Sequence, residues 1–222
     1  MKQDGNDFVT KLYPIKNVVF DLGGVLIAWN PDEIIAGVFD DTDLQALIKR
    51  EIFQHPDWLE IDKGHLEEID AIQRFHDRTG VPLTKLEELL QFLKETLTPI
   101  PESIELLEEL AAQGFNLYCL SNMPVCRFAH IQPLHKFWHH FKGIIISGEV
   151  KMLKPDREIF EHLLSEFKLQ ASETIFVDDM PINVEGAKEA GLHAVLFRDV
   201  DDCRRQLQSI FDNQQIVPEG EI

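Results

Sequence analysis

The sequence is poor in basic residues. Its 222 residues include 21 Lys and Arg against 39 Asp and Glu, which gives a formal net charge of −18. Proteins that bind nucleic acids or anionic membrane surfaces need clustered Lys and Arg to displace counterions. We therefore expect neither a nucleic acid nor a membrane among its partners. No pattern in the sequence specifies an oligomeric state.

Cysteines are scarce and long apolar runs are absent. The three cysteines, Cys119, Cys126 and Cys203, are an odd number without the spacing of a zinc site or a CxxC redox motif. No stretch reaches the ~18 apolar residues of a membrane-spanning helix, and residues 1–16 lack the apolar segment of a signal peptide. We expect reduced thiols and a cytoplasmic location.

What the sequence does contain is a series of short apolar runs rich in β-branched and aromatic residues. Runs of this kind are typical of strands buried on both faces of a parallel sheet. Helical patterns over 102–113, 155–167 and 183–190 precede the later runs, and this alternation predicts an α/β fold with a three-layer, Rossmann-like core. The predicted strands are 17–20, 116–120, 143–146, 174–177 and 194–197.

The interval between the first two predicted strands is too long for an ordinary crossover connection. It contains helical patterns and no strand pattern, so we predict an all-helical cap inserted after the first strand. The predicted domains are a core of residues 1–29 and 99–222 and a cap of residues 30–98. Residues 1–12 and the tail from Asp212 are predicted to be frayed. The helical patterns in the cap cover 32–39, 43–53, 66–79 and 84–96.

Polar residues follow the predicted strands at the ends where ligands bind in open α/β sheets. Asp21 follows the first strand, Ser121-Asn122 ends the second, Asp178-Asp179 ends the fourth, and Lys154 precedes a predicted helix. Each alone is an ordinary turn or capping residue. Together they converge on one site, and the two adjacent carboxylates repel each other unless a cation or water separates them.

The segments that carry these residues resemble known motifs. FDLGGVL, LSN, SGEVKMLKPDREIF and FVDDMPINVEGA are together similar to the haloacid dehalogenase superfamily, in the subgroup with a helical cap. The similarity is greater to sugar phosphatases related to α-D-glucose-1-phosphatase. It implies that Asp21 is the nucleophile of an aspartyl-phosphate intermediate, that Ser121 and Asn122 hold the phosphoryl oxygens, and that Lys154 neutralises charge.

The same resemblance implies a Mg²⁺ site. Its ligands would be Asp21, the backbone carbonyl of Gly23, and Asp178, with Asp179 in or beside the metal shell. Gly24 would contact the substrate. Carboxylates and carbonyl oxygens are the ligands that Mg²⁺ prefers, and a cation offsets the repulsion between a carboxylate nucleophile and a phosphate dianion.

Gly23 departs from the pattern of most phosphatases in the superfamily. They carry a second Asp at this position, which acts as general acid and base. Because a leaving oxygen that departs easily needs less protonation, we predict a sugar 1-phosphate or a similarly activated ester as the substrate.

The predicted function is therefore a Mg²⁺-dependent phosphatase for a small phosphorylated metabolite, with a sugar phosphate as the favoured substrate. Two alternatives stay open. One is a 2-haloacid dehalogenase with the same nucleophile, against which the Asp178-Asp179 pair argues. The other is a catalytically idle binding or regulatory module, for which Gly23 would be the sign of lost turnover.

Several other residues have two readings. Arg127 is either a contact for a substrate anion or a surface residue, and His135 and His139 are either solvent-exposed or an i, i+4 metal pair on a helix. Trp29 and Asn30 lie where the cap begins, and we expect them to act as a hinge or in packing, or one of them to touch substrate. Phe53 and Trp58 are expected to fill the cap core or to line a pocket.

Overall fold

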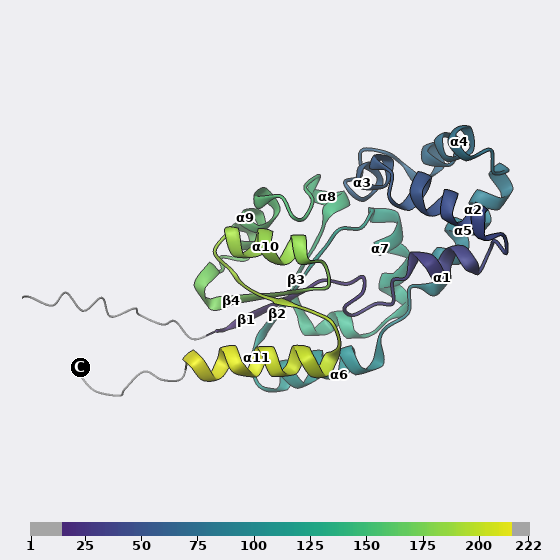
Figure 1. The fold of residues 1–222 in the computed structure, drawn as a ribbon. Helices are drawn as coiled ribbons and strands as arrows, with labels where there is room; N and C mark the ends of the chain where they lie inside the picture. Colours follow the sequence, from purple (N-terminus) through teal and green to yellow (C-terminus); the bar gives the residue numbers. More distant parts are fainter. Residues whose placement is uncertain (1–14, 215–222) are drawn as a thin grey trace, which may run out of the picture.

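The computed structural model describes residues 15–214, and its centre is a parallel five-stranded sheet (Figure 1). The strand order is β3-β2-β1-β4-β5, which places β1 in the middle. All five predicted runs are strands, so the predicted α/β class is confirmed. The bounds are β1 (Asn17–Phe20), β2 (Asn116–Ser121), β3 (Phe141–Ile146), β4 (Thr174–Asp178) and β5 (His193–Leu196).

Side chains of neighbouring positions in β1 and β4 enter different apolar clusters, because successive residues of a strand point to opposite faces. Val19 and Phe176 pack with α9 (Arg157–Glu166) and α10 (Pro181–Glu189). Val18 and Ile175 belong to the cluster that includes α6 (Pro101–Ala112) and α11 (Val200–Gln214). The sheet is therefore the middle of three layers, with a helix pair on each face (Figure 1).

Helix boundaries differ from those predicted at the start of α9 and at the end of α11. The helix expected from 155 begins at Arg157 after Asp156, so Lys154 lies in the turn before it. Residues 212–214, expected to be frayed, are still part of α11. The predicted fraying of residues 1–12 and of the tail beyond 214 lies outside the described residues.

The interval after β1 is helical, as predicted, and its helices form a separate lobe (Figure 1). Its short α3 was not predicted, because seven residues with Pro56 at the start give too short an apolar pattern. His55 Nδ1 accepts a hydrogen bond from Asp57 N and caps this helix. The helices are α1 (Pro31–Ala36), α2 (Thr42–Ile48), a π-helical turn η1 (Lys49–Phe53), α3 (Pro56–Asp62), α4 (Glu68–Thr79) and α5 (Leu83–Thr96).

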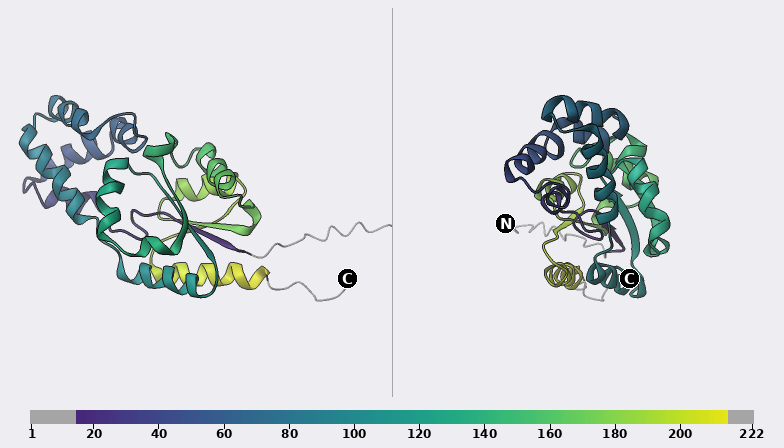
Figure 2. Two further views of the ribbon diagram at one scale, coloured as in Figure 1. Left: turned by 180° about the vertical axis from the view of Figure 1, so that it is seen from behind. Right: turned by 90° about the vertical axis from the view of Figure 1, so that its right-hand side faces the viewer.

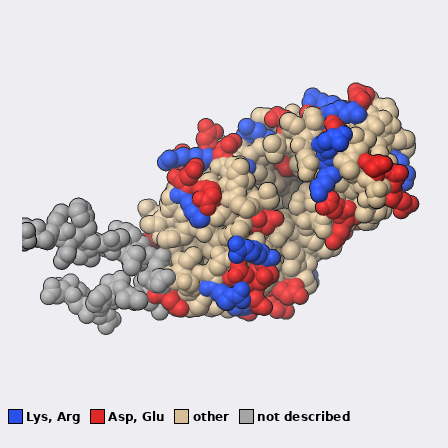
Figure 3. All heavy atoms as spheres, in the orientation of Figure 1, with Lys and Arg blue, Asp and Glu red and all other residues tan. Residues whose placement is uncertain are grey.

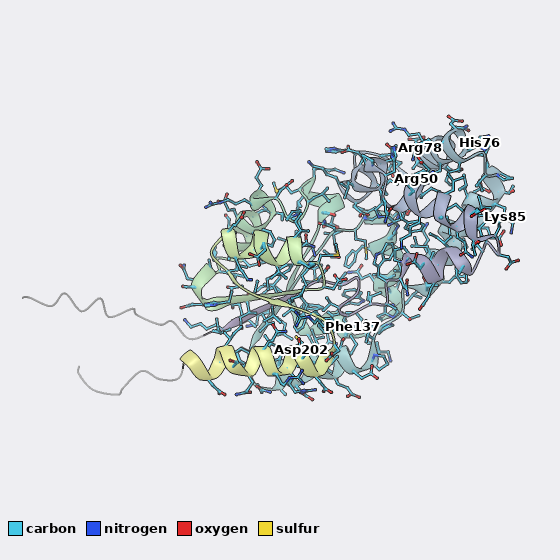
Figure 4. The ribbon with its side chains drawn as sticks, in the orientation of Figure 1. Arg50, His76, Arg78, Lys85, Phe137 and Asp202 are labelled. Carbon is cyan, nitrogen blue, oxygen red and sulfur yellow. The ribbon has the colours of Figure 1, made fainter. Side chains whose placement is uncertain are left out.

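A partly buried ion pair and leucine packing hold the lobe together. Arg78 of α4, labelled in the lobe in Figure 4, donates a hydrogen bond from Nη1 to Asp57 Oδ2 at 2.6 Å. Leu86, Leu89 and Leu93 of α5 are fully or almost fully buried. Shorter helical segments connect the elements of the core: α7 (Val125–Ile131), η2 (Gln132–Leu134), η3 (Phe137–His140), α8 (Ser147–Val150) and η4 (Ala171–Glu173).

The chain leaves and re-enters the core through two segments that lie side by side. Ala28 N donates to Thr98 O at 2.8 Å, and Ile100 N donates to Leu26 O at 2.9 Å. These bonds lie next to the predicted boundaries at 29/30 and 98/99, and the division into core and cap domains stays a prediction. Figure 2 shows, from behind and from the side, that the lobe stands at one end of the sheet.

That end is the carboxyl end of the strands, since β1 runs toward the lobe in Figures 1 and 2. No helix among residues 15–214 combines the length and apolar character needed to cross a membrane. The described cysteines are all free.

Leu93 should be a strong stability determinant of the cap. Its side chain is fully buried, so Leu93→Ala leaves a cavity and is expected to lower the free energy of unfolding by about 2–5 kcal/mol. Leu83, at the start of the same helix, is 38% exposed, and Leu83→Ala should change it by no more than about 0.5 kcal/mol. Urea denaturation monitored by tryptophan fluorescence measures both. Equal losses in the two variants would contradict this packing.

Candidate active site

Asp21 lies immediately after β1, at the middle of the sheet's carboxyl edge. Its backbone N still donates to Val177 O of β4 at 2.9 Å, which holds the residue at the strand end. Its Oδ1 accepts a 2.7 Å hydrogen bond from Leu22 N and lies 2.8 Å from Lys154 Nζ. Burial raises the pKa of Asp21 to about 7, against the opposing effect of the Lys154 charge.

Lys154 joins Asp21 to the end of β4. Its side chain is fully buried, and Nζ donates to Asp178 Oδ2 at 2.7 Å as well as pairing with Asp21. Burial on its own would lower the pKa of Lys154, but the two carboxylates hold it above its ordinary value. The ammonium is thus a permanent positive charge beneath the catalytic cavity.

Asp178 is held rigidly by donors from the following helix. Asn183 Nδ2 lies 3.0 and 3.1 Å from its two oxygens, and Met180 N donates to Oδ1 at 2.8 Å. Because Asn183 belongs to the first turn of α10, the helix start sets the position of this carboxylate. The sequence reasoning did not assign a role to Asn183.

Asp179 lies against the loop after β1. Burial and the neighbouring Asp178 charge raise the pKa of Asp179 to about 6. Gly24 has φ +73°, and a Cβ there would overlap the Asp179 carboxylate. Only glycine meets both conditions without strain, because L side chains rarely adopt positive φ.

These carboxylates form a group suited to a divalent cation. One oxygen from each of Asp21, Asp178 and Asp179 lies within 4.8 Å of the others, and this is the only group of three possible ligands among residues 15–214. An all-oxygen, carboxylate-rich set matches the preference of Mg²⁺. The three predicted carboxylate ligands are therefore brought together. Gly23 lines the adjacent cavity, and its carbonyl as a ligand stays a prediction.

The second strand contributes Ser121 and Asn122. Ser121 is 2% exposed and lines the cavity, as expected for a phosphate contact. Asn122 also lines the cavity, but its side chain holds the turn: Oδ1 accepts from Lys154 N, and Nδ2 donates to Lys154 O, both at 2.9 Å. The amide thus positions Lys154, and a direct contact of Asn122 with substrate stays a prediction.

A cavity of about 170 Å³ lies between these strand ends and the cap. Gly24 is not part of its lining, so the predicted substrate contact of Gly24 rests on the resemblance alone. Around the outside, basic and acidic side chains are interspersed on the face shown in Figure 3. The lining consists of Asp21, Gly23, Trp29, Trp58, Asp62, Leu97, Ser121, Asn122, Met123, Arg127, Lys154, Asp179, Met180 and Asn183.

Arg127 of α7 is buried in this lining, which corrects the surface alternative. Its guanidinium lies 4.2 Å from the centre of the Trp58 ring, and its Nε donates to Glu68 Oε1 at 2.6 Å. The Nη1 atom is 3.5 Å from Asp62 Oδ1. Sequence reasoning missed Asp62 and Glu68, because a carboxylate in an acidic cap is usually a solvated surface residue.

The aromatic residues singled out in the sequence lie in or beside the same cavity. Trp58 packs on Phe53 with ring centroids 4.6 Å apart and also faces the cavity, so it combines the two expected roles. Trp29 lies 6.0 Å from Trp58 and lines the cavity, whereas Asn30 caps α1. The histidine metal pair on a helix is wrong: His135 lies in extended backbone after η2 and contacts Leu97 O, whereas His139 lies in η3 and contacts Lys136 O.

The family is shown by comparison with known proteins. A family model described as haloacid dehalogenase-like hydrolase matches residues 15–191. The chain belongs to this family. It is therefore an enzyme of the hydrolase class, and the predicted superfamily is confirmed, while the glucose-1-phosphatase-like subgroup is not shown.

Two curated relatives are phosphatases. The haloacid dehalogenase-like chain is 33% identical over 177 residues to the sesquiterpene phosphatase astK of Aspergillus oryzae, covering 80% of this chain and 87% of the relative. It is 27% identical over 216 residues to the D-ribitol-5-phosphate phosphatase of Bacteroides thetaiotaomicron, covering 90% and 100%. Other relatives are longer, and the chain spans 37% of one of them.

A solved structure supports the fold. The haloacid dehalogenase family enzyme bt-2542 of Bacteroides thetaiotaomicron superposes with a TM-score of 0.67 at 23% identity, over 84% of this chain and 95% of that one. That enzyme has also been solved in complex with magnesium and inorganic phosphate. At this identity, the likeness establishes the shared architecture of sheet and cap.

Asp178 should determine cation affinity. Asp178→Asn removes one charged ligand from the carboxylate group, so we expect Mg²⁺ binding to weaken at least tenfold and hydrolysis of 4-nitrophenyl phosphate to fall with it. Calorimetric titration with MgCl₂ measures the affinity. Glu185→Gln, an exposed carboxylate on α10 paired with Lys188, is the matched control. Unchanged Mg²⁺ affinity in Asp178→Asn would exclude this site.

Proposed function

We propose that the protein is a Mg²⁺-dependent phosphatase for the phosphate ester of a small polar metabolite, with a sugar phosphate as the favoured class. The observation that carries this proposal is the composition of the cavity above Asp21. It combines the phosphate-handling residues of the core with two indole rings and the buried Asp62–Arg127 pair.

The proposed reaction proceeds through Asp21. Its carboxylate attacks phosphorus, the P–O bond to the leaving group breaks, and water then hydrolyses the aspartyl phosphate. Lys154 offsets the negative charge of nucleophile and phosphate, and Ser121 supplies a hydroxyl donor to a phosphoryl oxygen. When bound at the three carboxylates, Mg²⁺ supplies further charge stabilisation for the transferring phosphoryl group.

The polar groups in the cavity favour a substrate that forms hydrogen bonds. Asp62 Oδ1 and Arg127 Nη2 are buried and have no hydrogen-bond partner among the described residues. Both residues line the cavity, so part of its wall is polar, which suits a substrate with hydroxyl groups better than a hydrocarbon. The flat faces of Trp29 and Trp58 are suited to the apolar face of a sugar ring.

Gly23 supports the finer proposal of a sugar 1-phosphate. Gly23 has no side chain that could act as an acid. An anomeric oxygen leaves more readily than an alkoxide, so its departure depends less on an acid at this position. The small cavity volume agrees with a compact substrate.

A prenyl phosphate is the second candidate, because of the apolar part of the lining and the similarity to a sesquiterpene phosphatase. Leu97, Met123 and Met180 contribute this apolar surface. The unpartnered Asp62 and Arg127 atoms argue against it. Dehalogenation of a 2-haloacid is disfavoured by the carboxylate group, since three adjacent acids repel an anionic substrate unless a cation is present.

A substrate panel tests the proposal. We expect kcat/KM for sugar 1-phosphates to exceed that for simple alkyl phosphates and for farnesyl phosphate at least tenfold, because only the sugars satisfy the polar pair. Phosphate release measured with malachite green gives the ranking. Alkyl phosphates ahead of the sugars would contradict the sugar assignment, and farnesyl phosphate ahead of both would favour the prenyl candidate.

The reaction class is tested separately. Asp21→Asn should reduce hydrolysis of 4-nitrophenyl phosphate by a factor of about 10⁴ or more, and chelation with EDTA should abolish it reversibly. Asp156→Asn, which changes a residue outside the cavity lining, is the control. Full turnover in Asp21→Asn, or in EDTA, would rule out the proposed mechanism.

A further inference from the structure

Asp62 adds a third carboxyl group to the lining of the cavity, beside those of Asp21 and Asp179. It ends α3 of the cap and is 8% exposed. Its Oδ1 has no hydrogen-bond partner, and its contact with a positive charge is the 3.5 Å approach to Arg127 Nη1. A carboxylate left in this state is poorly compensated for the loss of water.

The charges around Asp62 are largely engaged elsewhere. Arg127 donates to Glu68, which also pairs with Lys94 at 3.0 Å, and Lys154 is shared by Asp21 and Asp178. Burial raises the pKa of Asp62 to about 7, with the Glu68 charge adding to the rise and Arg127 and Lys154 opposing it. The carboxyl group therefore holds a proton up to neutral pH, which is the range of an effective general acid.

The backbone around Asp62 is fixed to the core. Ser147 Oγ donates to Asp62 O at 2.5 Å and also accepts from Met123 N, a residue that lines the cavity. Lys151 Nζ, at the end of α8, donates to Gly64 O at 2.7 Å. The end of α3 is thus attached at the cavity rim, and its carboxyl group is a defined part of the lining.

Departure of an alkoxide-like leaving oxygen in phosphoryl transfer is faster when that oxygen takes up a proton, and Gly23 has no side chain to give it. The titratable residues in the lining are Asp21, Asp62, Lys154 and Asp179, with Arg127 always charged. Asp21 is the nucleophile, Lys154 is bound between two carboxylates, and Asp179 belongs to the cation group. Among the titratable residues of the lining, Asp62 is therefore the one that has no other function assigned and could supply the proton.

We propose that Asp62 of the cap is the general acid and base of the reaction, in place of the side chain that Gly23 lacks. This inference rests on the proposed phosphatase function. In the first step Asp21 forms a bond to phosphorus, the P–O bond to the leaving group breaks with its electron pair on oxygen, and that oxygen takes the Asp62 proton. In the second step Asp62 carboxylate takes a proton from water as the water oxygen bonds to phosphorus and the Asp21–phosphorus bond breaks. Phosphate and the starting enzyme result.

Asp62→Asn tests this role through its dependence on the leaving group. The amide keeps the shape but cannot transfer the proton, so kcat/KM for a sugar 6-phosphate should fall about 10²–10⁴-fold. The first step with 4-nitrophenyl phosphate, whose phenolate leaves without a proton, should change less than tenfold. Glu60→Gln makes the same change at an exposed site on α3 and should leave both substrates unaffected.

Pre-steady-state kinetics provides a readout that a structural role would not move. Because the second step loses its base, Asp62→Asn should release a burst of one 4-nitrophenolate per active site, followed by slow turnover. Equal losses with both substrates and no burst would overturn the role of Asp62. The burst also reports an intact nucleophile, so failure here is distinguishable from failure of the phosphatase proposal, which Asp21→Asn decides.

A second variant introduces an acidic side chain at position 23 in place of the one removed at position 62. A Cβ at Gly23 would lie 3.6 Å from Trp29 Cβ, which is ordinary van der Waals contact. Adding Gly23→Asp to Asp62→Asn should restore sugar 6-phosphate hydrolysis at least tenfold and remove the burst. A double variant that keeps the profile of Asp62→Asn with both substrates would count against proton transfer as the lost function.

Discussion

The buried ammonium of Lys154 between Asp21 and Asp178 is the interaction on which the rest of the structure depends. Two carboxylates at adjacent strand ends would repel each other in a site that excludes water, and Lys154 lies 2.8 and 2.7 Å from them. Other contacts maintain this arrangement: Asn122 holds the Lys154 backbone, and Asn183 holds the Asp178 side chain. The same charge that stabilises the two carboxylates also favours a phosphate dianion beside them.

The position of that site follows from the strand order. β1 is central, and the chain crosses to β2 on one side and to β4 on the other, so a crevice opens at their carboxyl ends. The cap is inserted directly after β1 and stands over this crevice (Figure 1). Trp58, Asp62 and Leu97 of this insertion therefore line the same cavity as the carboxylates and the lysine of the core.

Arg127 connects the two parts. It comes from α7 of the core, stacks on Trp58 and pairs with Glu68, both of the cap. This pairing leaves Asp62 without a strong counter-charge, although Asp62 is the cap carboxylate in the cavity lining. An imbalance of this kind is costly to stability and is typical of functional sites, where the pKa of a carboxyl group is matched to proton transfer.

The amino-acid sequence by itself determined the sheet, the helical insertion and the core of the site. Strands such as Thr174–Asp178 are short and apolar throughout, which is a local property, and parallel topology then brings Asp21, Lys154 and Asp178 to one edge. Only the tertiary structure decided the burial and the contacts of Asp62, Arg127 and Asn122. Their burial and partners depend on contacts between residues far apart in the chain, which no local pattern of charge or periodicity encodes.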